Sequence, residues 1–219
     1  IVGGGHAGIE AAFSLSRLGL KPTIITLDKN AIGRLSCNPA IGGLAKSHLV
    51  KEIDALGGVM GAAADACSIQ YKTLNKTKGR AVWSLRAQVD KKKYPKYIKG
   101  LIKKNNLISI IEDEAVEVLE QGGRTKGLQL KNNGVFLCKA VIITSGTFLN
   151  GLIHIGVNTF RAGRMGEKGS YGLTESLKSL GFEAGRLKTG TPPRISKKSI
   201  NFSLCKTSPG DPASSFFSL

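Results

Sequence analysis

The chain opens with Ile1-Val2-Gly3-Gly4-Gly5-His6-Ala7-Gly8, an apolar dipeptide followed by a glycine turn with the spacing G-x-G-x-x-G. Gly3 allows the tight turn, Gly5 lets the backbone approach a pyrophosphate, and Gly8 lets a helix pack closely on a strand. A helical stretch follows, and residues 21–27 contain the β-branched run Thr-Ile-Ile-Thr, which favours a strand. This order of strand, glycine turn, helix and strand predicts the first half of a dinucleotide-binding unit.

The N-terminus of that helix would face the phosphate charge of a bound dinucleotide. The candidate cofactor-binding residues of the turn are therefore Gly3, Gly4, Gly5, His6, Ala7 and Gly8. The alternative is a glycine-rich turn that holds no ligand. An acidic residue normally closes the second strand and holds the ribose hydroxyls. Here Thr26-Leu27 ends the strand and Asp28 follows, so Asp28 is either the ribose contact or a turn residue.

Apolar periodicity and glycine stops predict three further helices. One covers residues 44–56, and its apolar face would consist of Ala45, Leu49, Ile53 and Leu56. The others cover residues 87–104 and 174–180.

Short apolar and β-branched runs predict strands over residues 107–111, 115–119 and 127–130. Gly122-Gly123 suits the turn of a hairpin between the last two, and Phe136-Leu137 extends it to a meander. Residues 140–144 form a continuous apolar run that is typical of a buried parallel strand. The sequence therefore predicts an α/β, Rossmann-like fold with a small antiparallel β-meander.

The two ends of the chain suggest a fragment of a longer protein. Only two residues precede the glycine turn, which is short for a buried strand. At the other end, residues 216–219 form an apolar run for which we expect no packing partner. Past Ser196 the composition shifts to Ser, Lys and Pro, so we expect an incomplete domain over residues 1–195 and the start of an inserted domain or a linker over residues 196–219.

The four cysteines form no C-x-x-C pair, so the sequence supports neither a zinc site nor a dithiol redox motif, and we expect no metal. A reducing cytoplasm is the simplest context for them. No run of about 18 apolar residues exists, so no membrane span is expected.

The segment Ser36-Cys37-Asn38-Pro39-Ala40-Ile41-Gly42-Gly43 is the second notable motif. A loop of Asn, Pro and paired Gly exposes backbone N–H groups and can approach a flat ring or an oxyanion. Cys37 lies near the predicted helix start, where the helix dipole favours a thiolate. The alternative for Cys37 is a small buried side chain.

Positive charge is concentrated in one part of the chain. The formal net charge is +17, with a pI near 9.9. Residues 71–104 contain twelve Lys and Arg and one acid, Asp90, so this stretch carries +11 of that charge. It is either a solvated helix face or a phosphate-binding surface for nucleic acid.

Several segments together resemble the MnmG family, also called GidA, over almost the whole chain. Two of them, Ser36–Gly43 and Gly185-Arg-Leu-Lys-Thr-Gly-Thr-Pro-Pro-Arg194, are far more specific than the glycine turn, which many flavoproteins share. The others are Gly3–Gly8, Leu49–Gly58, Lys78-Gly79, Arg86-Ala-Gln88 and Gly146-Thr-Phe-Leu149.

The resemblance implies a truncated FAD-binding fold of the glutathione-reductase type. Members of the family take electrons from NADH and work as a homodimer within a heterotetramer with a GTPase partner called MnmE. They add an aminomethyl-type group to C5 of the wobble uridine of tRNA, with methylene-tetrahydrofolate as the one-carbon donor.

Three further positions gain a role from the resemblance. Val116 and Ser170 match FAD contacts of the family, and Cys37 matches a cysteine that is important for modification. A thiolate is suited to adding at C6 of uracil, which activates C5, or to supporting the transfer. The basic stretch would then supply phosphate contacts to tRNA from Lys72, Lys76, Lys78, Arg80, Arg86 and Lys91 to Lys93.

Two rival functions remain at this level. A related folate- and FAD-dependent tRNA uridine-5 methyltransferase shares the glycine motif, but the Ser36–Gly43 and Gly185–Arg194 segments favour the wobble enzyme. The other rival is a non-catalytic nucleic-acid-binding flavoprotein fragment. The later part of the family's FAD domain and its C-terminal helical domain lie outside this sequence, so we expect the fragment alone to be inactive.

Overall fold

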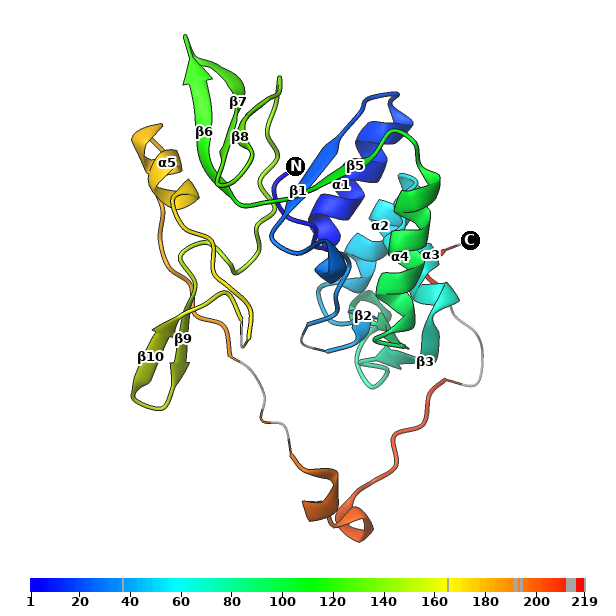
Figure 1. The fold of residues 1–219 in the computed structure, drawn as a ribbon. Coiled ribbons are helices and arrows are strands. Elements are labelled where there is room, and N and C mark those ends of the chain that lie inside the picture. The colour runs from blue at the N-terminus through cyan, green and yellow to red at the C-terminus, as the bar shows by residue number, and fades with distance from the viewer. Residues whose placement is uncertain (37, 165, 191–192, 194, 212–215, 219) are drawn as a thin grey trace.

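The structure is a computed structural model that describes every residue of the chain except 37, 165, 191–192, 194, 212–215 and 219. Two groups of elements lie side by side (Figure 1). The elements between residues 6 and 112 form one group, and those between residues 115 and 179 form the other.

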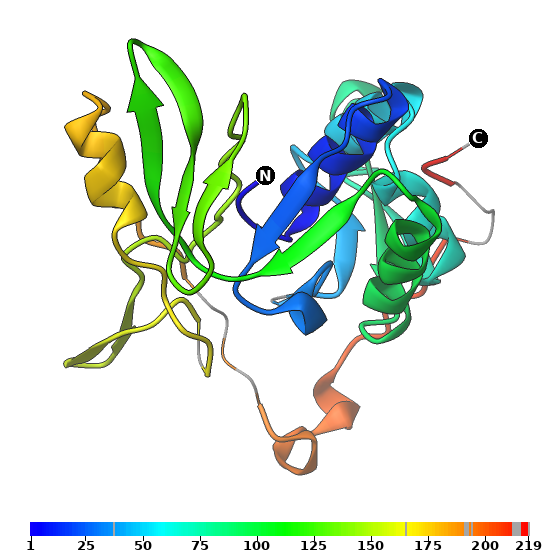
Figure 2. The same cartoon turned by 45° about the horizontal axis from the view of Figure 1, so that its top comes forward.

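Parallel strands near the chain start connect the two groups (Figure 2). Strand β1 (Thr23–Thr26) pairs in parallel with β5 (Ser109–Glu112). On the other side of β1, Val2 bridges in parallel to Ile25 and to Ile143. Residues 140–144 thus pair in parallel as expected, but only through an isolated bridge at Ile143, and their burial is incomplete, since Ile142 is exposed.

Helix α1 (His6–Arg17) confirms the helix expected after the glycine turn. Its buried face consists of Ile9, Ala12 and Phe13, which recur at three- and four-residue spacing. Gly19 follows with a φ of +76°, the left-handed conformation that stops a helix.

A long excursion separates β1 from β5 and builds a second, antiparallel sheet with the strand order β2-β4-β3. Its helices cover the core beside α1 (Figure 1). The elements of the excursion are η1 (Lys29–Ala31), β2 (Ala40–Gly42), α2 (Ser47–Ala55), α3 (Met60–Ala66), β3 (Ser68–Leu74), η2 (Arg80–Val82), β4 (Ser84–Val89) and α4 (Lys93–Lys104).

The apolar face expected for the helix over residues 44–56 is wrong. Helix α2 begins only at Ser47, and Ala45 precedes it with a φ of +55°. Ser47 and Val50 face the core, whereas Leu49 and Leu56 are exposed. A helix this short buries one narrow stripe, and its contacts with α3 and β2 decide which stripe that is.

The helix expected over residues 87–104 is also wrong in its first part. Residues 84–89 form β4, in which Ala87 pairs with Ile41 on one side and Tyr71 on the other. The hydrogen bonds of β4 to its two neighbouring strands thus outweigh the helix propensity of this segment. Asp90 ends the strand, and its carboxylate accepts the N–H groups of Lys92 and Lys93 at the start of α4.

The expected meander and the helix after it are confirmed. Strands β6 (Ala115–Gln121), β7 (Arg124–Leu130) and β8 (Gly134–Leu137) pair in that order, and α5 (Leu173–Ser179) packs on β6. Their core contains Ala115, Leu128, Leu130 and Leu173, together with Val2 and Ile25. A further hairpin of β9 (Leu152–Ile155) and β10 (Asn158–Arg161) projects from this group.

The end of the chain returns to the first group, contrary to the expectation that residues 216–219 have no packing partner. Phe217 is buried in the core that contains α1 and the antiparallel sheet. The Asp65 carboxylate accepts the backbone N–H groups of Phe217 and Ser218, at 3.1 and 2.8 Å. The apolar pattern of residues 216–219 could not predict this contact, because Asp65 lies 152 residues before Phe217.

Among its described residues, the segment that connects α5 to Phe217 contains only the short turns η3 (Lys197–Ser199) and η4 (Phe202–Leu204), both exposed. The domain boundary near residue 196 stays a prediction. Among the helices that the structure describes, none combines the length and the apolar composition that crossing a bilayer requires.

Candidate cofactor site

The glycine turn is built so tightly that two of its positions exclude any side chain. A Cβ on Gly3, whose φ is +107°, would lie 2.4 Å from the Thr144 carbonyl oxygen. A Cβ on Gly8 would lie 2.0 Å from the carbonyl oxygen of Gly3. Gly5 differs, because a Cβ there would meet no atom within 4 Å. The turn therefore packs closely on one side and is open at Gly5, where a ligand can approach the backbone.

The open side of the turn is also the N-terminus of α1. Gly5 is the N-cap residue, no side chain caps the helix, and its first turn contains no acidic residue. The first N–H groups of an α-helix have no partner within the helix, and they lie at the positive end of its dipole. An anion such as a phosphate would supply both the missing acceptors and the opposing charge.

Thr144, which follows the bridge residue Ile143, holds the turn in place, a role that the sequence pattern did not reveal. Its hydroxyl donates to the carbonyl oxygen of Val2 at 2.9 Å and lies 3.2 Å from that of Gly3. Its backbone N–H also donates to Val2 at 2.8 Å. The only sign of this role in the sequence is that Thr144 ends the apolar run of residues 140–144.

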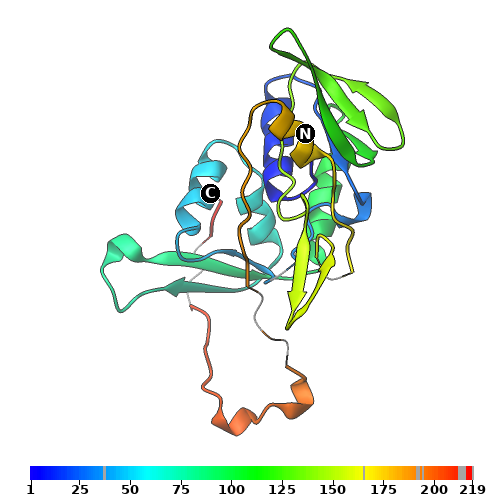
Figure 3. The same cartoon turned by 90° about the vertical axis from the view of Figure 1, so that its left-hand side faces the viewer.

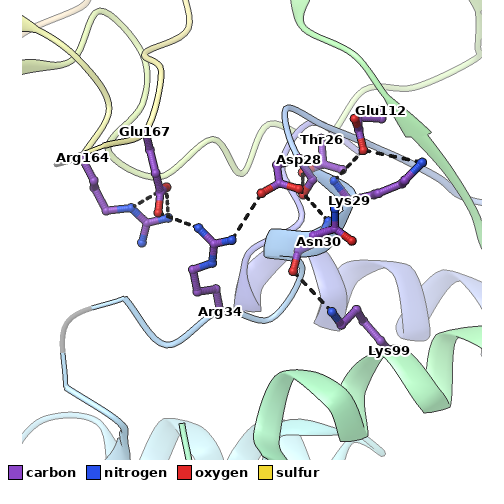
Figure 4. A network of polar contacts seen from close by, with 9 residues as sticks. All are labelled: Thr26, Asp28, Lys29, Asn30, Arg34, Lys99, Glu112, Arg164 and Glu167. Carbon is purple, nitrogen blue, oxygen red and sulfur yellow. Dashed lines mark hydrogen bonds and ion pairs between the residues drawn. The ribbon is translucent and has the colours of Figure 1, made fainter. Parts of the chain in front are cut away.

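Asp28 occupies the end of β1, and its carboxylate already has two partners (Figure 4). One oxygen accepts the N–H of Asn30 at 2.7 Å, which starts η1, and the other lies 3.3 Å from the Arg34 guanidinium. The turn role considered for Asp28 is therefore present in the structure. A ribose contact stays a prediction and would compete with Arg34 for the same carboxylate.

Arg34 joins this turn to the second group of elements. Its other nitrogen lies 2.9 Å from a Glu167 carboxylate oxygen, and Glu167 also binds Arg164 at 2.9 Å (Figure 4). The ion-pair chain thus connects the loop that precedes residue 37 with the loop that leads to Ser170.

Val116 and Ser170, far apart in the sequence, lie in adjoining segments. A Cβ on Gly172, two residues after Ser170, would lie 3.0 Å from the Val116 carbonyl oxygen. Ser170 is buried and bridges to Leu149. The structure brings these two positions together, and their contact with a cofactor stays a prediction.

Glu114 fixes this junction from the start of the meander. Its carboxylate accepts the N–H of Tyr171 at 2.9 Å and pairs with Lys131 at 2.9 Å. Burial alone would raise the pKa of Glu114, but Lys131 and the Tyr171 N–H hold it below its usual value. The carboxylate is thus charged at neutral pH and keeps the segment of Ser170 against β6.

His6, the first residue of α1, packs against α4. Its ring lies edge-on to Tyr94, with ring centroids 5.6 Å apart. Burial lowers the pKa of His6, so the ring is neutral at pH 7. A neutral ring here adds no charge to the anion site at the helix N-terminus.

Cys37 lies outside the described residues, and its predicted role is untested. Its neighbour Ser36 has a buried hydroxyl oxygen that finds no hydrogen-bond partner among the described residues. Such an atom is expensive to bury unpaired, which fits a polar ligand group beside this loop. Within the described residues, no group of three or more His, Cys, Asp and Glu side chains is arranged to hold a metal ion.

The residues present fit a dinucleotide cofactor on two independent observations. The glycine turn leaves the α1 N-terminus open and uncapped, and the Ser36 hydroxyl lacks a partner among the residues that the structure describes.

Comparison with known proteins shows the family. The family model described as "Glucose inhibited division protein A" matches residues 1–219. The chain belongs to this family. This agrees with the resemblance found in the sequence, and the expected Rossmann-like α/β fold is confirmed by the solved structure described next.

Individual members of the GidA family are similar over almost all of this chain. The protein from Aquifex aeolicus, "GidA in the form II crystal", is 45% identical, with a TM-score of 0.94 over 99% of this chain and 36% of its own. Two curated relatives are named "tRNA uridine 5-carboxymethylaminomethyl modification enzyme MnmG". The one from Thermodesulfovibrio yellowstonii is 51% identical and the one from Campylobacter fetus 50%, each over 96% of this chain and 34% of the relative.

The chain therefore spans about a third of the length of the GidA relatives it matches. What those relatives do as whole proteins is a property of a much longer chain.

Proposed function

We propose that this chain is the FAD-binding part of an enzyme that modifies C5 of the wobble uridine of tRNA. The observation that carries the proposal is the open glycine turn at the uncapped N-terminus of α1, in a chain that matches the GidA family along its whole length. The names of the curated relatives supply the substrate class, tRNA uridine.

Different residues of the chain would bind different parts of FAD. The N–H groups at the start of α1 receive the pyrophosphate, with Gly5 giving the close approach. Val116 and Ser170, which adjoin through Gly172, contact the cofactor from the side of the meander. Asp28 holds the ribose hydroxyls at the end of β1. Bound FAD would supply the redox chemistry, and this chain would hold and orient it.

The full-length protein completes the reaction with parts that this chain lacks. We infer NADH as the reductant, methylene-tetrahydrofolate as the one-carbon donor, and a (carboxymethyl)aminomethyl group as the addition. A homodimer would work with an MnmE-type GTPase in a heterotetramer in the cytoplasm. Cys37 is the proposed catalytic residue, either as the nucleophile at C6 of the uracil or in support of the transfer.

The experiment that tests the function is mass spectrometry of tRNA nucleosides from cells without the full-length gene. The expected result is loss of the C5 aminomethyl-type group from the wobble uridine. Loss of T-loop ribothymidine instead would assign the methyltransferase function. No change in either nucleoside would contradict tRNA modification altogether and leave a non-catalytic flavoprotein.

A substitution tests the role of Cys37. In the full-length protein, Cys37→Ser is expected to retain FAD, seen by its absorbance, and to lose modification in the nucleoside assay. Ser keeps the size of the side chain and removes the thiolate. Normal modification by this variant would contradict the catalytic role of Cys37 and would leave the proposed FAD binding unaffected.

A further inference from the structure

The hairpin of β3 and β4 carries charged side chains of only one sign. Residues 68–89 contain five basic side chains and no acidic one. The hairpin reaches out beyond the neighbouring helices (Figure 3, teal). The five cations are Lys72, Lys76, Lys78, Arg80 and Arg86.

Two of these cations stand directly opposite each other. Lys72 of β3 is the register partner of Arg86 of β4, so both side chains lie on one face of the sheet. Like charges in such a cross-strand pair destabilise a sheet. Within the described part of the chain, neither side chain has a carboxylate partner, and the Lys72 ammonium donates only to the Ser208 hydroxyl. An anion between them would offset the repulsion.

The same pair lies beside the Gly42-Gly43 end of the Ser36–Gly43 segment. Arg86 is also the register partner of Gly42 in β2, on the other side of β4. The Arg86 side chain reaches the next residue as well, because a Cβ on Gly43 would lie 4.0 Å from the Arg86 Cδ. Residues 42 and 43 end the Ser36–Gly43 segment, so the cationic pair flanks that segment through backbone pairing.

An aromatic side chain stands near the tip of the hairpin. Trp83 is 42% exposed, and its indole N–H donates to the Lys78 carbonyl oxygen at 3.0 Å. The Arg80 guanidinium lies over the ring, 5.6 Å from its centroid. The hydrogen bond fixes the ring, so it offers exposed aromatic surface without losing rotamer freedom on binding.

We propose that the β3–β4 hairpin binds an unpaired stretch of RNA, with a backbone phosphate between Lys72 and Arg86 and a base stacked on Trp83. This rests on the proposed function and assigns a surface to its tRNA substrate. Strand β3 has seven residues and extends about 23 Å at ~3.3 Å per residue, a length over which several successive phosphates can be contacted. Basic side chains interleaved with an aromatic ring are the chemistry of single-strand RNA binding.

The hairpin places this RNA beside the Gly42-Gly43 end of the Ser36–Gly43 segment. A phosphate held by Arg86 lies next to Gly42 and Gly43, and the neighbouring nucleotide is then within reach of the Ser36–Gly43 segment. A small dinucleotide such as NADH would need only one end of this surface, and it does not account for the basic residues in the connection between the two strands.

The test uses the full-length protein loaded with FAD and measures the affinity for unmodified tRNA at several salt concentrations. The variant K72Q/R86Q is expected to weaken binding and to reduce the slope of log K against log[salt] by about 0.7 for each phosphate that the variant no longer neutralises. The variant Trp83→Ala is expected to weaken binding roughly 5- to 100-fold with an unchanged slope, because stacking releases no counterions. Trp83→Phe should retain most of the affinity.

The matched control is K103Q/K104Q, which removes two exposed lysines from the last turn of α4 and leaves the hairpin unchanged. Equal effects of the control and of K72Q/R86Q would overturn the hairpin assignment and leave only general electrostatic attraction. A raised KM for NADH in tRNA-free oxidation, with tRNA affinity unchanged, would overturn it in favour of a nicotinamide site. If the wild-type protein binds no tRNA and its loss changes no nucleoside, the proposed function fails as well.

Discussion

The glycine turn and the β3–β4 hairpin are both candidate phosphate sites, but opposite means produce them. The turn depends on the lack of side chains. Gly3 and Gly8 have no room for a side chain, and the donors at the α1 N-terminus are backbone groups. The hairpin works through side chains, with Lys72 and Arg86 aligned by strand pairing. A backbone site should fail abruptly when one residue changes, whereas a side-chain surface should lose affinity in steps.

The sharpest test of this difference lies within the turn itself. Gly8→Ala places a Cβ 2.0 Å from a backbone oxygen, so we expect the free energy of unfolding to fall by about 3 kcal/mol or more. Gly5→Ala places a Cβ in open space with φ at −77°, so stability should change by less than about 0.5 kcal/mol. Denaturant unfolding measures both.

Flavin affinity separates the same two variants in a second way. Gly5→Ala should fold normally and still bind FAD roughly tenfold or more weakly, because the added methyl occupies the approach to the α1 N-terminus. Titration of the folded apoprotein with FAD measures this loss. Unchanged FAD affinity in Gly5→Ala would show that the pyrophosphate lies elsewhere.

An intermediate effect is expected where the hairpin pairs with β2 at Gly42. A Cβ on Gly42 would lie 2.4 Å from the Leu85 carbonyl oxygen and 2.5 Å from the Phe217 ring, at a φ of +79°. We expect Gly42→Ala to cost about 2 kcal/mol in unfolding free energy and to weaken tRNA binding by displacing β2 from Arg86.

Gly43→Ala is the control for this junction. Its φ is +99°, but a Cβ there would have only ordinary contacts, the nearest at 3.9 Å. The expected cost is about 1 kcal/mol, from backbone strain alone. If the two alanine variants are equally stable, the packing of Phe217 and β4 on β2 does not hold the junction.

The smallest effect is expected near the turn of the hairpin, where Asp211 pairs with Lys76 at 2.7 Å and accepts the Thr73 N–H. Lys76 is the leading cause that lowers the pKa of Asp211 to about 2. Because the folded-state pKa is depressed, this stabilisation is complete above the ordinary carboxyl pKa and is lost as pH falls from about 4 to about 2.

Asp211→Asn should therefore lower the midpoint of thermal unfolding by only a few degrees at pH 7. The difference from the wild-type protein should vanish near pH 2. A difference that persists at pH 2 would mean that the Asp211 charge is not what holds the segment to β3.

Local patterns were sufficient for the turn, the first helix and the meander, because each depends on contacts between residues close in sequence. Gly19 ended α1 and Gly122-Gly123 closed the β6–β7 hairpin as expected, since both positions need a positive φ. The same reasoning failed for residues 87–104. Ala87 has good helix propensity, but its partners Ile41 and Tyr71 make it a strand residue, and Asp90 was the overlooked start signal of α4.

The candidate site likewise combines features that the sequence predicted and features that it could not predict. The spacing of Gly3, Gly5 and Gly8 predicted the tight glycine turn, because Gly8 packs against Gly3 within the turn itself. The same amino-acid order could not reveal that Thr144 holds the turn, that Arg34 ties Asp28 to Glu167, or that Phe217 lies against Gly42.

The amino-acid sequence alone was enough to determine the family, the α/β class and the glycine turn, since these depend on short-range sterics and on residue order. Only the tertiary structure decided which of the many cations lie beside Gly42 and Gly43. Strand pairing places Arg86 against Gly42 and Lys72, while the lysines of α4 belong to a separate helix packed on α3. The physical reason is that charge is a property of each residue, whereas its placement depends on hydrogen bonds between strands that are distant in the chain.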